Sequence, residues 1–164
     1  MSDISVLILM GSGSDAPVMQ EAVDTLAEFG IPCEMTVASA HRSPARVERL
    51  IDQAPARGVK VFIVGAGAAA HLAGTVAART TRPVIGVPID SSALRGMDAL
   101  LSTVQMPPGV PVATVSIGKP GAVNAAVLAA QILAVGDAAM SAKIDAYKAK
   151  LAEKVERAAE ELRG

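Results

Sequence analysis

Short runs of branched apolar residues alternate along this chain with longer alanine-rich segments, in which apolar positions recur every three or four residues. The short runs predict five strands, at Val6 to Met10, Glu34 to Ala38, Val59 to Val64, Val84 to Val87 and Val112 to Ile117. The longer segments predict helices at Ala16 to Phe29, Ala45 to Arg57, His71 to Arg79 and Ala122 to Val135. This alternation is typical of βαβ units, whose parallel strands are buried on both faces.

The order of these elements predicts an α/β fold, a three-layer α/β/α sandwich with a central parallel five-stranded sheet, for which we favour flavodoxin-like strand order. A chain of 164 residues suffices for one well-buried core, so residues 1–164 are expected to form a single domain. Gly30, Gly58 and Gly136 each follow a predicted helix, where a left-handed cap suits glycine, and Pro44 suits the first turn of the second helix.

Residues 137–164 are rich in Ala, Lys and Glu and contain no proline, which predicts a long C-terminal helix. An apolar stripe runs along one side of it, formed by Ile144, Tyr147, Leu151, Val155, Ala158 and Leu162. Because the other predicted helices already cover both faces of the sheet, we expect this stripe to pack on a neighbouring subunit. The alternative is that it packs on the core of its own chain.

Composition and charge argue against several classes of partner. Charged residues make up 19% of the chain and the net charge is -1, so nothing here attracts nucleic acid or an anionic membrane. No apolar stretch has the length of about eighteen residues that a spanning helix needs. The single cysteine, Cys33, cannot form an internal disulfide, and no secretory signal pattern opens the chain. We therefore expect a cytoplasmic protein.

Ligands of open parallel sheets bind beyond the carboxyl ends of the strands. In this chain the segments expected there are Gly11 to Asp15, Ser39 to Ser43, Gly65 to His71 and Pro88 to Ser92. They contain both histidines of the chain, His41 and His71. This edge of the sheet is therefore the predicted functional site.

The glycine loop from Gly11 to Asp15 opens the first helix, so its backbone amides and hydroxyls are suited to an anion or a polar ligand. With Ala16 it completes a weak G-x-G-x-x-A match, but a dinucleotide site requires an acid after the second strand, where Ser39 and His41 stand instead. The Asp15 carboxylate is better suited to ribose hydroxyls. The alternative is that Ser14 or Asp15 caps the helix.

Arg42, with the neighbouring hydroxyls of Ser39 and Ser43, offers a guanidinium fork suited to a phosphate monoester; the alternative is a surface arginine that precedes a helix. His41 suits general acid or base catalysis near neutral pH. Two histidines on one ligand-binding edge favour function over a structural role. They fall short of the usual metal-ligand set, although Asp15 could complete a weak site.

Two further segments have unusual composition. Gly65 to Gly74 carries almost no side-chain bulk, which suits either tight packing of strand on helix or the floor of a narrow, dry pocket. Leu100 to Val112 shows no clear periodicity and holds three prolines. We expect it to be an irregular loop before the fifth strand, forming either a wall of the site or a subunit contact.

Taken together, these segments resemble the N5-carboxyaminoimidazole ribonucleotide mutase family, class I of the PurE family. The resemblance spans nearly the whole chain and is carried by Met10 to Asp15 with Met19, Ser39 to Pro44, Ala66 to Leu72, Leu101 to Pro107 and Ile117 to Ala125. The chain departs from the family at Ala16, Ser43 and Ala73, where tryptophan, threonine and proline are usual. Ser43 keeps the hydroxyl, and the other two departures change packing around the loops more than chemistry.

The resemblance implies an isomerase of de novo purine biosynthesis that acts on a small ribonucleotide without metal or organic cofactor. The carboxylate on the exocyclic nitrogen of the substrate moves to ring carbon C4 through trapped carbon dioxide. His41 is then the catalytic residue, which protonates the departing nitrogen and later removes the C4 proton. The implied substrate-binding residues are Ser12, Asp15, Ser39, Arg42, Gly67, Ala68, Ala70, His71 and Leu72. The resemblance also implies a homo-octamer with sites between subunits and a C-terminal helix that crosses an interface.

Two alternatives remain open. The nearest keeps the fold and ligand but carboxylates aminoimidazole ribonucleotide directly from carbon dioxide, as a relative of the family does. The other is a protein without catalysis, either a nucleotide-binding module that uses the first glycine loop and Arg42 or a purely structural, oligomer-forming chain. We favour the mutase because the loop motifs resemble that branch of the family.

Overall fold

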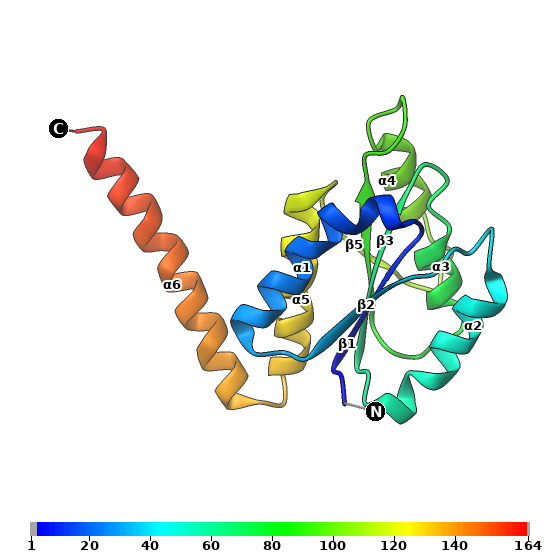
Figure 1. Cartoon of the computed structure of the whole chain (residues 1–164). Coiled ribbons are helices and arrows are strands. Elements are labelled where there is room, and N and C mark those ends of the chain that lie inside the picture. Colours follow the sequence, from blue (N-terminus) through cyan, green and yellow to red (C-terminus); the bar gives the residue numbers. More distant parts are fainter. Residues whose placement is uncertain (1–2, 164) are drawn as a thin grey trace.

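The computed structural model describes residues 3–163 and contains a parallel sheet of five strands in the order β2-β1-β3-β4-β5 (Figure 1). This is the flavodoxin-like order, so the predicted fold is confirmed. The strands are β1 (Val6–Met10), β2 (Cys33–Val37), β3 (Val61–Gly67), β4 (Val84–Ile89) and β5 (Ala113–Thr114).

Helices cover both faces of this sheet. They are α1 (Ala16–Phe29), α2 (Pro44–Gln53), α3 (Leu72–Ala77), α4 (Met97–Val104), α5 (Lys119–Ala134) and α6 (Ala138–Glu161). The side chains of α1 and α5 share one core with one face of the sheet, whereas α2, α3 and α4 contribute to the core on the opposite face (Figure 1). The predicted three layers are therefore present.

The two cores meet at β1, where successive side chains point to opposite faces. Val6 and Ile8 pack beneath α1 and α5, while Leu7 and Leu9 pack beneath α2 and α3, and all four are fully buried. Because both faces are buried, the strand is apolar at every position. This explains why the sequence shows continuous apolar runs rather than alternation.

Several predicted boundaries differ from the structure. Pro55 follows the end of α2, and a short 3-10 turn over Pro55–Arg57 replaces the last turn of the predicted helix because proline cannot donate the helical hydrogen bond. The strand β3 continues to Gly67, since its pairing with β4 runs on to Gly67 and Ile89. At the sheet edge, β5 has only two residues because it pairs with β4 at Ile85 and Gly86 alone.

Two predictions were wrong. The segment expected to be an irregular loop from Leu100 contains most of α4, whose periodicity is concealed because Leu101 and Val104 on its exposed side are apolar too. Gly136 is not a left-handed cap, whereas Gly30 and Gly58 are, with φ of 71° and 80°. A hydrogen bond from the Asp137 N–H to the Ala134 carbonyl closes the turn after α5, so no left-handed residue is needed there.

The predicted C-terminal helix is present as α6, and Asp137 caps it by accepting a hydrogen bond from the Met140 amide. Ile144 is buried, and the centre of the Tyr147 ring lies 5.2 Å from the centre of the Phe29 ring. The first turns of α6 therefore pack on their own chain. Beyond them α6 projects away from the sheet (Figure 1), with Leu151 48% and Val155 67% exposed. No helix within residues 3–163 combines the length and apolarity needed to cross a membrane.

Candidate active site

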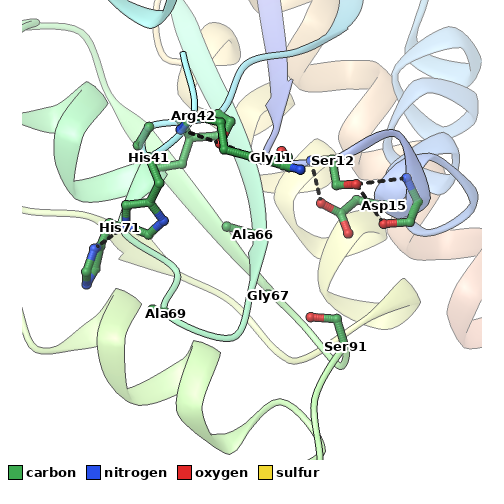
Figure 2. A pocket seen from close by; sticks show the side chains of 14 residues that line it. Gly11, Ser12, Asp15, His41, Arg42, Ala66, Gly67, Ala69, His71 and Ser91 are labelled. Atoms are coloured by element: carbon green, nitrogen blue, oxygen red, sulfur yellow. Dashed lines mark hydrogen bonds between the residues drawn. The ribbon is translucent and has the colours of Figure 1, made fainter. Parts of the chain in front are cut away.

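A cavity of about 530 Å³ opens at the carboxyl edge of the sheet, where the segments that follow β1, β2, β3 and β4 meet (Figure 2). Its walls are formed by Gly11, Ser12, Ser14, Asp15, Ser39, Ala40, His41, Arg42, Ala66, Gly67, Ala69, His71, Leu72 and Ser91. Eight of the ten residues predicted for the site line this cavity, all except Ala68 and Ala70. Residues far apart in the sequence are thus brought to one place by the parallel sheet.

The loop after β1 is held by its own hydrogen bonds. The Ser12 amide donates to Asp15 Oδ2 at 3.0 Å, and the Ser14 hydroxyl donates to Ser12 Oγ at 2.9 Å. Neither Ser14 nor Asp15 caps α1 itself through its side chain, but Asp15 completes a capping box with Ser12 around the 3-10 turn Gly13–Asp15 that precedes α1, so the capping alternative is partly confirmed. The loop also presents a carboxylate at the cavity wall.

Asp15 is 5% exposed, and this burial raises the pKa of its carboxyl group above the usual value of 3.8. The hydrogen bond from the Ser12 amide and the positive charge of Arg42 oppose that rise. Because the pKa of Asp15 is higher in the folded than in the unfolded protein, protonation of this carboxyl group stabilises the fold. This stabilisation is complete below the unfolded-state pKa and is lost as the pH rises through the folded-state pKa. The ionised carboxylate at neutral pH therefore costs stability.

We expect Asp15→Asn to raise the Tm at pH 7 by about 2–4 °C, because the neutral amide removes the cost of burying a charge. The same variant should bind a ribonucleotide about tenfold more weakly, since an amide oxygen is a poorer acceptor for hydroxyl groups than a carboxylate. Thermal unfolding at pH 7 and below pH 3.8, with a binding titration, checks both effects. A Tm gain that persisted undiminished at the acid pH would contradict the assigned cause.

Arg42 joins the loops after β1 and β2. Its Nη2 donates to the Gly11 carbonyl at 2.8 Å and its Nε donates to Ser39 Oγ at 3.3 Å. Figure 2 shows the guanidinium reaching across to Gly11. Nη1 makes no hydrogen bond within residues 3–163. Arg42 is therefore a fixed cation at the cavity wall and not merely a surface residue before α2.

The two histidines contact each other. His41 Nε2 lies 2.6 Å from His71 Nδ1, and the two rings are nearly perpendicular, at 82° (Figure 2). One ring must donate this hydrogen bond and the other accept it, so at most one of them is positively charged while the bond persists. The pair can therefore hold one exchangeable excess proton at the cavity wall.

The cavity floor is built from small residues. A Cβ atom at Gly67 would lie 1.8 Å from Ser91 Oγ, so only glycine allows this close approach of β3 to the loop after β4. Ser91 lies within one of the segments predicted for this edge but was not itself predicted as a site residue. Ala68 is exposed and Ala70 is buried; neither lines the cavity, and their role in binding stays a prediction.

The cavity thus combines three kinds of chemistry. The histidine pair can move a proton, Arg42 can hold an anion, and the Asp15 carboxylate can accept hydrogen bonds from hydroxyl groups. Within residues 3–163 there is no group of three His, Cys, Asp or Glu side chains that could hold a metal ion, so Asp15 and the histidines do not form the weak site considered above. The arrangement suits an anionic sugar ligand that undergoes proton transfer.

Comparison with known proteins gives a consistent result. Residues 5–154 match the family model of AIR carboxylase. The N5-carboxyaminoimidazole ribonucleotide mutase of Bacillus subtilis is 58% identical over 84% of this chain and 85% of its own length. The protein of the same name from Pyrococcus horikoshii is 52% identical over 94% of this chain and 86% of its own length. The crystal structure of Treponema denticola PurE aligns with a TM-score of 0.87 at 29% identity, covering 97% of this chain and 98% of that one. This chain therefore belongs to the AIR carboxylase family.

Proposed function

We propose that this enzyme is an N5-carboxyaminoimidazole ribonucleotide mutase of de novo purine biosynthesis. It moves a carboxylate from the exocyclic nitrogen of its substrate to ring carbon C4, giving 4-carboxy-5-aminoimidazole ribonucleotide. The observation that carries the proposal is the meeting of a histidine pair, a fixed arginine and a buried carboxylate at one cavity. Relatives that bear the mutase name at 52–58% identity support it. The lone cysteine fits a reducing cytoplasm.

Each part of the ribonucleotide has a matching group in the cavity. Arg42 and Ser39 hold the phosphate, because a guanidinium fork with a hydroxyl satisfies several phosphate oxygens at once. Ser12 and Asp15 hold the ribose, with the carboxylate accepting hydrogen bonds from its hydroxyl groups. The base then faces His41, His71 and the small residues that follow β3. A volume of about 530 Å³ is in the range of small-molecule sites.

His41 moves one proton out and back during a turnover. It donates a proton to the exocyclic nitrogen, the bond from this nitrogen to the carboxyl carbon breaks, and aminoimidazole ribonucleotide and carbon dioxide form. The electrons of the ring then make a new bond from C4 to carbon dioxide, and C4 carries both hydrogen and carboxylate. His41 finally removes the C4 proton, which restores the ring and the starting protonation state. Because protonation alone drives the first cleavage, the proposed reaction needs no cofactor.

His71 keeps the His41 ring oriented between these steps. Its Nδ1 lies 2.6 Å from His41 Nε2, so it can exchange hydrogen-bonding roles with His41 as the proton leaves and returns. The backbone holds His71 directly before α3, on a different loop from His41. The hydrogen bond between the two rings therefore links the loop after β2 to the turn after β3.

Small apolar residues at the cavity floor suit the carbon dioxide intermediate. Ala66, Gly67 and Ala69 line the cavity without any polar side-chain atom. Such a surface offers water few partners and leaves room for a small apolar molecule beside the base. This favours recapture of carbon dioxide at C4 over its escape.

The proposal is tested by measuring turnover of the purified enzyme in two separate reactions. One reaction contains N5-carboxyaminoimidazole ribonucleotide, and the other contains aminoimidazole ribonucleotide with a low concentration of bicarbonate. We expect rapid turnover of the first. The description of the matching family model, AIR carboxylase, favours direct carboxylation as the second candidate. Turnover of only the second mixture would establish that candidate and overturn the mutase.

We infer further that the enzyme is a homo-octamer with its active sites between subunits. Two exposed apolar surfaces support this assembly. One is the projecting part of α6, and the other is the outer side of α4 with Met97, Leu101 and Val104. Exposed apolar surface of this kind marks a protein interface. We propose that α6 crosses to a neighbouring copy of this chain.

Placing charges on the α6 stripe should therefore break the assembly. We expect the double variant Leu151→Glu, Val155→Glu to lower the particle mass measured by light scattering, because burying two carboxylates in an apolar contact costs several kcal/mol. The matched control is Ala142→Glu, Ala149→Glu, which adds the same charges to exposed positions on the opposite side of the helix. An unchanged mass for the stripe variant would show that α6 does not hold the subunits together.

A further inference from the structure

The turn that joins β3 to α3 carries the cavity floor and His71 within five residues, Gly67 to His71. It is tight and strained. Ala68 adopts a left-handed conformation, with φ of 51°, which an L side chain rarely adopts. The His71 amide donates to the carbonyl of Ala69, only two residues earlier, at 2.9 Å. Such a turn persists only when its surroundings hold it.

Ser102 of α4 stabilises this turn through a hydrogen bond. The amide of Ala70 donates to Ser102 Oγ at 3.0 Å, and Ala70 is 1% exposed, so this amide has little access to water. The Ser102 hydroxyl in turn lies 2.8 Å from the Asp98 carbonyl of its own helix, to which it donates. A single oxygen thus ties the middle of the turn to α4.

The helix α4 is also hydrogen-bonded to the loop after β4, a second segment of the cavity wall. Asp98 Oδ2 accepts a hydrogen bond from the Ser92 hydroxyl at 2.7 Å. Ser92 follows Ser91, whose side chain lies against Gly67 and points toward the cavity (Figure 2). One turn of α4 therefore anchors two segments of the site, the loop after β4 through Asp98 and the turn after β3 through Ser102.

We infer that Ser102 is a positioning residue for the reaction: it holds the turn after β3 so that the His71 imidazole meets His41. The inference rests on the proposed mutase function. Ser102 is not among the residues that line the cavity, so it acts through His71. Its removal should disturb proton transfer at the histidine pair while leaving Arg42 and Asp15, which hold the ribonucleotide, in place.

Kinetics of Ser102→Ala test the inference. We expect kcat to fall about 10- to 100-fold, the cost of displacing a catalytic group by about an ångström, and KM to stay close to the wild-type value. Ser102→Thr, which restores the hydroxyl, should recover most of the loss. The matched control is Thr103→Val: the neighbouring Thr103 hydroxyl donates only within α4, to the Ala99 carbonyl, so its loss should leave kcat unchanged.

The histidine pair also gives a direct structural readout. The chain has only two histidines, so the ring signals of untagged protein labelled with ¹³C at histidine Cε1 report His41 and His71 alone. We expect both signals to shift in Ser102→Ala and to return in Ser102→Thr. Wild-type kcat and unshifted ring signals in Ser102→Ala would overturn the inference. Absence of mutase turnover in the wild-type enzyme would instead overturn the proposed function, because the ring signals can be measured without substrate.

Discussion

His41→Asn is expected to lower kcat for the mutase reaction by roughly 10²- to 10⁴-fold, the usual contribution of a general acid or base. Asparagine keeps a polar side chain that can donate a hydrogen bond to His71 Nδ1, but it cannot release and recover a proton. The affinity for aminoimidazole ribonucleotide should stay unchanged, because the proposed phosphate and ribose contacts are made by Arg42 and Asp15 and not by His41. Single-turnover kinetics with a separate binding titration measures the two effects.

His71→Asn is the matched variant for this experiment, because it introduces the same side chain at the other ring. Since His71 is proposed to orient His41 and not to touch the transferred proton of the substrate, its replacement should cost less in kcat. Wild-type turnover by His41→Asn would refute the assignment of His41 as the proton-transfer group. Equal losses in the two variants would show that the rings act as one unit.

Arg42→Met is expected to weaken ribonucleotide binding by about 10- to 150-fold, the equivalent of one charge-assisted hydrogen bond of about 1.5–3 kcal/mol. The corresponding ribonucleoside, which lacks the phosphate, should bind the variant and the wild type equally. This contrast isolates the phosphate contact from any general disturbance of the cavity. Titrations of both ligands by calorimetry measure it.

Arg79→Met supplies the control for loss of an arginine away from the cavity. Arg79 Nη1 donates to Glu48 Oε1 at 3.1 Å, and Arg79 lines neither the cavity nor the adjoining pocket that contains Arg42. We expect this control to keep wild-type affinity for the ribonucleotide. Equal weakening of ribonucleoside and ribonucleotide by Arg42→Met would place the phosphate elsewhere in the cavity.

Much of the site follows from the strand pattern alone. Once the strands are recognised as parallel, their carboxyl ends must lie at one edge of the sheet, so Ser12, Arg42 and Gly67 are expected near one another. The individual contacts do not follow. Whether Asp15 caps α1 or accepts from Ser12 depends on side-chain rotamers, and the hydrogen bond between His41 and His71 depends on where two separate loops bring their rings.

The sequence pattern did not predict that α4 contributes to the site. Its sequence offers weak periodicity because both of its sides carry apolar residues, and the prolines after it suggest a loop. Nothing in the pattern around Ser102 indicates that its hydroxyl accepts the Ala70 amide, since the two residues lie on different elements 32 positions apart. The same applies to Ser91, whose approach to Gly67 depends on the spacing of β3 and β4.

The amino-acid sequence is sufficient to predict the layer architecture, the order of most helices and strands, and the edge of the sheet at which the candidate site lies. These depend on hydrophobic periodicity and on glycine and proline, which act over a few residues along the chain. Three features follow only from the packed structure: the hydrogen bond between His41 and His71, the hydrogen bond from the Ala70 amide to Ser102, and the projection of the end of α6 from the domain. Such features depend on the distances between elements, which packing of the whole chain sets and no local pattern encodes.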